Sequence, residues 1–273
     1  MYFSEISSKF FPSNNVTLYI DGREITFNTR YPHECQYIAK ILLDIRIPQA
    51  DIDSALFKKF IKKGDKVLDA GANIGFTAIE CLKNGASSVV AVEPVPEIFK
   101  RLVDISKDWE ISPLQMGISN ISGVVNMTVS QAHNQGSTIN EKILKIFPQI
   151  FGGRGETVQI ETTTIDAIVE QYGSFDIWKL DIEGAEVEAL EGAMKTLAKK
   201  PPRVIIAEIY DDFFKDFKNI VSLTHPYGYR AFLRKNDYEL ELTDVNMFDE
   251  SKYEQTSPMY IFSQKDLVQI KAM

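Results

Sequence analysis

The stretch KVLDAGANIG, Lys66–Gly75, decides the fold of this 273-residue chain. An apolar run ends in Asp69, and the chain then passes Gly71, Asn73 and Gly75. Glycines at such a turn let the backbone approach a ligand, and the helix that follows exposes amide N–H groups to it. The stretch therefore predicts a β-strand, a ligand-binding turn with exposed N–H groups, and the start of a helix.

Strand-like and helix-like segments alternate on both sides of this turn. Strands are expected at 67–70, 88–93, 112–117, 123–130, 155–164, 175–184, 203–209, 229–235 and 259–264, and helices at 54–63, 75–84, 94–104, 164–172 and 185–197. Such alternation is typical of βαβ units, in which helices cover both faces of a largely parallel sheet. The sequence therefore predicts an α/β fold whose ligands bind beyond the carboxyl ends of the strands.

The first 50 residues have a different pattern. Residues 16–27 predict a β-hairpin around Asp21-Gly22, a dipeptide that suits a tight turn. Residues 32–45 predict a helix that Pro48 ends. We expect a small cap of residues 1–52 on a main domain of residues 53–273.

Composition limits the classes of partner. The formal net charge of −8 argues against a broad nucleic-acid surface, and no run of about 18 apolar residues predicts a membrane span. The two cysteines, Cys35 and Cys81, have neither disulfide-framework nor metal-site spacing. With no signal-peptide pattern at the start, we expect a cytoplasmic protein; its oligomeric state is open, a homodimer included.

Four acidic residues, Asp69, Glu93, Asp181 and Glu208, fall at the carboxyl ends of predicted strands. Glu93 lies about 20 residues after Gly71, the spacing at which an acid accepts hydrogen bonds from the ribose of an adenosine cofactor. The loop-plus-acid pair therefore predicts an adenosine cofactor rather than a simple tight turn.

The cofactor could be a dinucleotide or S-adenosylmethionine (SAM). A pyrophosphate prefers glycine at the middle position of the turn, where Asn73 stands, and Asp69 would repel it. A cationic sulfonium or amino group suits a negative pocket, so SAM is favoured. An NAD(P)-dependent oxidoreductase remains the alternative enzyme, and a non-catalytic SAM-binding module is a third reading.

Four segments, VLDAGANIGFTAI, VVAVEPVPEIFKRL, TTTIDAIVEQYGSFDIWKLDIEGAEVEALEGA and RVIIAEI, resemble the motifs of the FkbM-type SAM-dependent methyltransferases. The resemblance covers roughly residues 53–235. It implies a class I methyltransferase (Rossmann-like) fold, with a seven-stranded, mostly parallel sheet and one antiparallel strand near the end. It also implies O-methylation of a hydroxyl on a sugar, glycan or polyketide-type natural product.

The resemblance assigns the cofactor-binding residues position by position. The methionine end of SAM would meet the glycine loop, Glu93 with the adjacent Pro94 would hold the ribose, and the segment after the third strand would flank the adenine. Ser137, in a short serine-containing stretch, would face the pocket. The loop residues are Asp69, Gly71, Ala72, Asn73 and Gly75, and the adenine segment contains Gln115, Met116 and Gly117.

The segment WKLDIEGAE supplies the candidate catalytic residues. Lys179 lies in a strand that should be buried and needs a partner, and Asp181 is two residues away on the same face. Asp181 is the leading candidate for the base that removes the hydroxyl proton, with Glu183 and Glu208 supporting it. Asp181 and Glu208 could instead bind Mg²⁺ or another divalent cation. A purely structural Lys179–Asp181 ion pair is the alternative.

Residues 131–157 form the one long irregular stretch. It could be a lid or substrate loop, or a surface insertion with one short helix at 143–147. His133 within it could act as a base near neutral pH, although a lone loop histidine is more often solvated. The acceptor, a small molecule or a saccharide, is not determined by the sequence.

Overall fold

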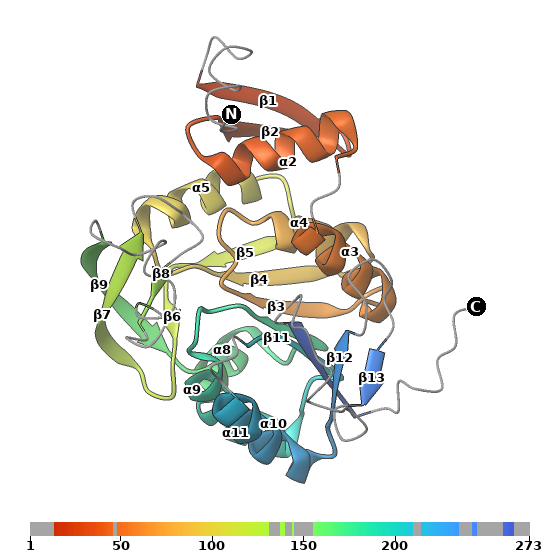
Figure 1. Ribbon diagram of the computed structural model, residues 1–273, viewed down its shortest axis with the longest axis vertical. Coiled ribbons are helices and arrows are strands. Elements are labelled where there is room, and N and C mark those ends of the chain that lie inside the picture. Colours follow the sequence, from red (N-terminus) through yellow and green to blue (C-terminus); the bar gives the residue numbers. More distant parts are fainter. Residues whose placement is uncertain are drawn as a thin grey trace.

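The computed structural model describes residues 14–45, 48–130, 137–139, 144, 155–209, 214–234, 242–244 and 259–264. Its centre is a large sheet with helices on both faces. A smaller sheet lies to one side, and an N-terminal hairpin and helix lie on top (Figure 1). Within the described ranges, no helix combines the length and apolar character needed to cross a membrane.

The large sheet has the strand order β13-β12-β14-β11-β10-β3-β4-β5. Its strands are β3 (Lys66–Ala70), β4 (Ser88–Val92), β5 (Ile111–Leu114), β10 (Ile177–Leu180), β11 (Val204–Glu208), β12 (Arg230–Arg234), β13 (Leu242–Asp244) and β14 (Met259–Ser263). The five neighbouring strands β11, β10, β3, β4 and β5 pair in parallel, whereas β14 is antiparallel to both β11 and β12. The predicted mostly parallel sheet with a late antiparallel strand is confirmed. The predicted count of seven is one short, because β13 adds an antiparallel edge strand next to β12.

Helices cover both faces of this sheet. They are α3 (Pro48–Phe60), α4 (Phe76–Lys83), α5 (Pro96–Ser106), α8 (Ile165–Tyr172), α9 (Glu186–Glu191), α10 (Met194–Lys199), α11 (Phe214–Thr224) and the short 3₁₀ helix η1 (His225–Tyr227). Alternate residues of β3 divide the core, because Val67 packs with α3, α4 and α5, and Leu68 packs with α8 to α11. Thr164 caps α8 as predicted, its Oγ1 accepting a hydrogen bond from the N–H of Ala167 at 3.1 Å.

Two predicted helix boundaries are wrong. The single helix expected at 185–197 is the pair α9 and α10, which separate at Gly192. There the chain passes so close to Ser119 that a Cβ would lie 2.4 Å from the Ser119 carbonyl oxygen. Pro48 begins α3 rather than ending the preceding helix, which stops at Leu43 with Asp44 in the left-handed conformation.

A second, four-stranded sheet has the order β6-β9-β7-β8. It consists of β6 (Gly117–Ile118), β7 (Gly123–Ser130), β8 (Ser137–Thr138) and β9 (Gly155–Thr163). The strands β7 and β9 were predicted, but their separation from the large sheet was not. Because β6 directly follows β5, the small sheet begins at the carboxyl edge of the large one, where a ligand site is expected.

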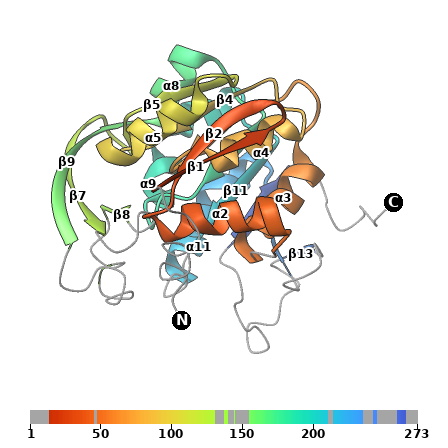
Figure 2. The same cartoon turned by 90° about the horizontal axis from the view of Figure 1, so that it is seen from above.

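The N-terminal cap contains the predicted hairpin, β1 (Asn15–Ile20) and β2 (Arg23–Asn28), and α2 (Pro32–Leu43). Looking down on the cap, Figure 2 shows the hairpin in front of α4 and α5. Arg101 of α5 donates to the Thr26 carbonyl at 2.8 Å and pairs with Glu34 at 2.7 Å. The expected domain boundary at 52/53 falls inside α3, so that division stays a prediction.

Candidate active site

The turn after β3 is held by its own hydrogen bonds. Gly71 and Ala72 both donate to the Val92 carbonyl at 3.0 Å, and Gly75 donates to the Ala72 carbonyl at 2.8 Å. Asn73 donates to Glu93 Oε2 at 3.1 Å, and its Oδ1 accepts from the N–H of Ile74 at 2.8 Å. Every backbone N–H from 71 to 75 is therefore used within the protein. The turn itself therefore offers no N–H group to a ligand, and the prediction of exposed N–H groups now concerns only the first turn of α4.

The backbone of this turn needs the residues that the sequence supplies. Gly71 and Gly75 have φ of 76° and 95°, and Asn73 has φ of 50°. Asparagine is among the few residues with a side chain that enter this region readily. Asn73 thus replaces the middle glycine of a dinucleotide loop without backbone strain.

Glu93 follows β4 and faces the turn. Its side chain is buried, with Oε1 accepting from the N–H of Val95 at 2.9 Å and Oε2 from that of Asn73. Burial raises the pKa of Glu93 to about 7, although the two backbone donors act in the opposite direction. Glu93 can therefore change charge near neutral pH.

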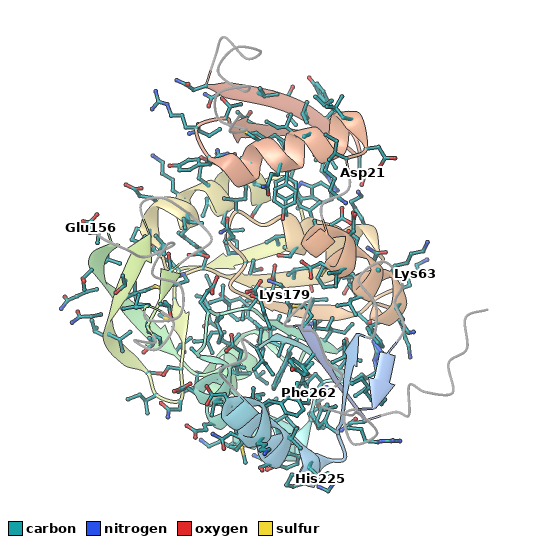
Figure 3. All side chains as sticks on the ribbon, viewed as in Figure 1. Asp21, Lys63, Glu156, Lys179, His225 and Phe262 are labelled. Carbon is teal, nitrogen blue, oxygen red and sulfur yellow. The ribbon has the colours of Figure 1, made fainter. Side chains whose placement is uncertain are left out.

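Lys179 lies in the middle of the sheet (Figure 3). It forms ion pairs with two carboxylates. Strand register places it directly beside Asp69, 3.5 Å from Asp69 Oδ1, and its Nζ is 3.0 Å from Asp181 Oδ2. Burial would lower the pKa of Lys179, but Asp181 and Asp69 outweigh it and raise that pKa well above its usual value. Thr77 completes the cluster by donating to Asp69 Oδ2 at 2.5 Å. The predicted Lys179–Asp181 pair is present.

Three carboxyl groups meet where β10 and β11 end. One oxygen from each of Asp181, Glu183 and Glu208 lies within 4.8 Å of the others. Burial opposes ionisation of Asp181, but Lys179 and a hydrogen bond with Glu208 lower its pKa. Burial, followed by the nearby Asp181 charge, raises the pKa values of Glu183 and Glu208 well above the usual range. The group therefore combines an ionised carboxylate with carboxyl groups that hold protons more tightly.

A cavity of about 260 Å³ joins the turn to these carboxyl groups. Gly71, Asn73 and Glu93 line one side, and Asp181, Glu183 and Glu208 line the other. The remaining lining is mostly apolar: Val92, Pro94, Ile98, Met116, Gly117, Ile118, Met127, Ser137, Ile139, Ile160, Ile182 and Ala185. Residues of both the large sheet and the small sheet thus line the cavity.

Several predicted residues lie elsewhere. Asp69 does not line this cavity, because its carboxylate is buried beside Lys179, and Ala72 is also buried. Gly75 lies under Leu102, whose Cδ1 would be 2.7 Å from a Cβ at position 75. Gln115 is exposed and lies outside the lining. His133 and the helix predicted at 143–147 fall on the part of the chain that the structure does not describe, apart from residue 144.

Sequence reasoning missed the apolar wall formed by Met127, Ile139 and Ile160. The alternation in 123–130 and 155–164 indicated half-buried strands, but it did not show which surface they cover. Glu186 is another residue with a local role, since its Oε1 accepts from the N–H groups of Ile182 at 3.1 Å and Gly184 at 3.3 Å. Glu186 therefore stabilises the turn that carries Glu183.

The family model described as the methyltransferase FkbM domain matches residues 69–240, which include the glycine turn and all three clustered carboxyl groups. The chain belongs to the FkbM methyltransferase family. The resemblance of its motifs is thereby confirmed.

Two curated relatives match only part of this FkbM-family chain. A ribosomal protein L11 methyltransferase from Thermotoga neapolitana is 35% identical over 86 residues, covering 30% of this chain and 33% of the relative. Methyltransferase sdnD from Sordaria araneosa is 26% identical over 153 residues, covering 46% and 59%. The chain therefore spans about a third to three fifths of these relatives.

Solved structures with similar folds include the FkbM methyltransferase from Methylobacillus flagellatus, at 15% identity and a TM-score of 0.46, with 77% of this chain and 50% of that one covered. TYW2 from M. jannaschii, solved in complex with AdoMet, gives 10% identity and a TM-score of 0.44, with coverages of 92% and 85%.

Proposed function

We propose that this FkbM-family protein is a SAM-dependent methyltransferase that methylates a hydroxyl group of a sugar, glycan or polyketide-type natural product. The observation that carries the proposal is one cavity lined on one side by the turn after β3 and by Glu93, and on the other by the carboxyl groups of Asp181, Glu183 and Glu208. Such a cavity could bind an adenosine cofactor next to groups able to remove a hydroxyl proton.

The charge of the cavity supports SAM over a dinucleotide. All its ionisable lining residues in the described part of the chain are acidic, namely Glu93, Asp181, Glu183 and Glu208. Those that are ionised, Asp181 above all, would repel a pyrophosphate and attract a sulfonium or an amino group. Asp69 lies outside the lining, so the acidic character comes from these four residues.

Glu93 and the apolar wall suit the two ends of adenosine. Ribose hydroxyls would donate to Glu93, as they do to an acid after the second strand in related sheets. Ile98, Met116 and Ile118 would pack on the flat adenine ring.

Methyl transfer needs an aligned acceptor oxygen and a proton acceptor. Bound SAM would supply the methyl group: the acceptor oxygen would bond to the methyl carbon as the carbon–sulfur bond breaks, its electron pair staying on the sulfur of S-adenosylhomocysteine. The hydroxyl proton would pass to Asp181, which Lys179 keeps ionised. Because Asp181 is hydrogen-bonded to Glu208, two carboxyl groups could share that proton.

Thermal denaturation with SAM, S-adenosylhomocysteine and NAD tests the cofactor. At about 100 times its Kd, either adenosyl compound should stabilise the protein by about 2.7 kcal/mol, a rise in Tm of roughly 5–10 °C for a chain of this size. NAD should give no shift. Stabilisation by NAD and by neither adenosyl compound would instead favour the oxidoreductase.

Glu93→Gln tests the ribose role and a pH dependence. The variant should bind S-adenosylhomocysteine at least about tenfold more weakly, since bonds to a charged acceptor contribute about 1.5–3 kcal/mol. Because the folded pKa of Glu93 is raised to about 7 from 4.5, the ligand-free native state loses stability as pH rises through that window. The loss is on the order of 3 kcal/mol.

Glu93→Gln removes this titration, so the Tm of the variant should improve relative to wild type between pH 5 and pH 8. Glu97→Gln, at an exposed position in the first turn of α5, serves as the control. Equal pH dependence in both variants would contradict the role given to Glu93.

A further inference from the structure

The meeting point of Asp181, Glu183 and Glu208 is built by the backbone on both sides. The N–H of Asp181 donates to the Ala70 carbonyl at 3.1 Å, which fixes the end of β10 against β3. Glu183 has φ of 54° on the turn that Glu186 holds, and Glu208 ends the buried strand β11. The oxygens within 4.8 Å of one another therefore come from anchored positions.

The side chains of the described residues do not neutralise this group. Lys179 is its cationic neighbour, and that charge is already shared between Asp69 and Asp181. No ion pair among the described residues involves Glu183 or Glu208. Glu208 is buried and hydrogen-bonded to Asp181, and Glu183 is half-buried. An ionised carboxylate at such a position normally has a paired cation or a metal, and a bound cation would supply the counterion that the described side chains do not.

Ser137 provides a separate indication of a ligand. Its side chain is 9% exposed, its Oγ is inaccessible and has no hydrogen-bond partner among the described residues, and it lines the same cavity. The adjacent Thr138 donates to the Glu183 carbonyl at 2.6 Å, which holds β8 against the turn. Buried hydroxyls are normally hydrogen-bonded, so an unpartnered one in the lining of the same cavity as the three carboxyl groups indicates a missing ligand.

We infer that Asp181, Glu183 and Glu208 bind one hard divalent cation, Ca²⁺ or Mg²⁺, with Ser137 Oγ as a further oxygen ligand. All four donors are oxygens, and in the described lining no histidine or cysteine favours a softer metal. One oxygen from each carboxyl group lies within 4.8 Å of the other two, close enough for the three to bind the same ion, whether Ca²⁺ or Mg²⁺.

The use of the cation rests on the proposed function, but the site itself does not. A cation here would take the acceptor hydroxyl as a ligand and lower its pKa, which makes the proton easier for a carboxylate to remove. It would also fix the oxygen in the same cavity as the cofactor.

Calorimetric titration of the EDTA-treated, desalted 273-residue protein with CaCl₂ and MgCl₂ tests the inference, and Mn²⁺ electron paramagnetic resonance counts the sites. One equivalent is expected to bind. Glu183→Gln and Glu208→Gln should each weaken binding at least about tenfold, because each removes a charged ligand. Ser137→Ala should weaken it by a smaller factor. Glu93→Gln removes a carboxylate of the same cavity outside the cluster and should leave cation affinity unchanged.

Two results would overturn the inference: no cation binding by wild-type protein at millimolar concentration, or equal binding by wild type and both cluster variants. Circular dichroism checks that each variant is folded. S-adenosylhomocysteine binding separates the two proposals. Binding of the nucleoside without a cation removes only the metal site, and binding of a cation without the nucleoside removes only the proposed function.

Discussion

Asp181→Asn is expected to lower methyl transfer by about 10²–10⁴-fold, the range contributed by a positioned general base. Affinity for S-adenosylhomocysteine should stay close to wild type. The amide matches the carboxylate in shape but cannot accept the proton, and Lys179 keeps Asp69 as its remaining partner at 3.5 Å. Transfer of the label from methyl-tritiated SAM into fractionated extracts of the source cells measures activity on whichever acceptor those extracts contain.

Asp104→Asn is a matched control, since Asp104 also pairs with a lysine, at 2.9 Å from Lys107, but on the surface. It should transfer label normally. Near-normal turnover by Asp181→Asn would exclude Asp181 as the base. Loss of both turnover and nucleoside binding would point to a structural ion pair instead.

Gly71→Ala should abolish nucleoside binding and destabilise the fold by at least about 4 kcal/mol, a size reserved for severe backbone or core defects. A Cβ at position 71 would lie 1.8 Å from the carbonyl oxygen of Asp181, and the residue has φ of 76°. Removing this clash would require β3 to move away from the segment that carries the candidate catalytic residues. Urea denaturation followed by circular dichroism measures the loss.

Gly22 in the cap hairpin allows the cost of the left-handed backbone conformation to be measured without the steric clash. It has nearly the same φ, 78°, but nothing lies within 4 Å of its added Cβ. Gly22→Ala should therefore cost only about 1–2 kcal/mol, the usual penalty of a left-handed alanine. Similar losses in the two variants would show that the approach of Gly71 to Asp181 is unimportant.

The sequence predicted those helices, strands and turns that depend on the local pattern of apolar, glycine and acidic residues. The stretch 66–75 specified β3, its turn and α4, and the strand-end position of Glu93, Asp181 and Glu208 placed them at one edge. The neighbours of each group were not predictable. Lys179 lies beside Asp69 because β10 pairs with β3, and that register follows from packing of the whole sheet.

Longer-range contacts account for the other differences. Alternation identified β7 and β9 as strands, but only the tertiary structure shows that they cover the cavity. The break between α9 and α10 arises where Gly192 meets Ser119, a contact between segments more than 70 residues apart in sequence. The helix propensities of neighbouring residues cannot predict such a long-range contact.

The internally bonded turn has a consequence for how the protein behaves among competing metabolites. Most adenosine compounds in a cell, including ATP and NAD, carry phosphate groups that seek free backbone N–H donors. Between residues 71 and 75 each of those donors already has an acceptor within the protein. Residues 71–75 would therefore offer a phosphate group no backbone donor, whereas SAM carries no phosphate and needs none at this turn.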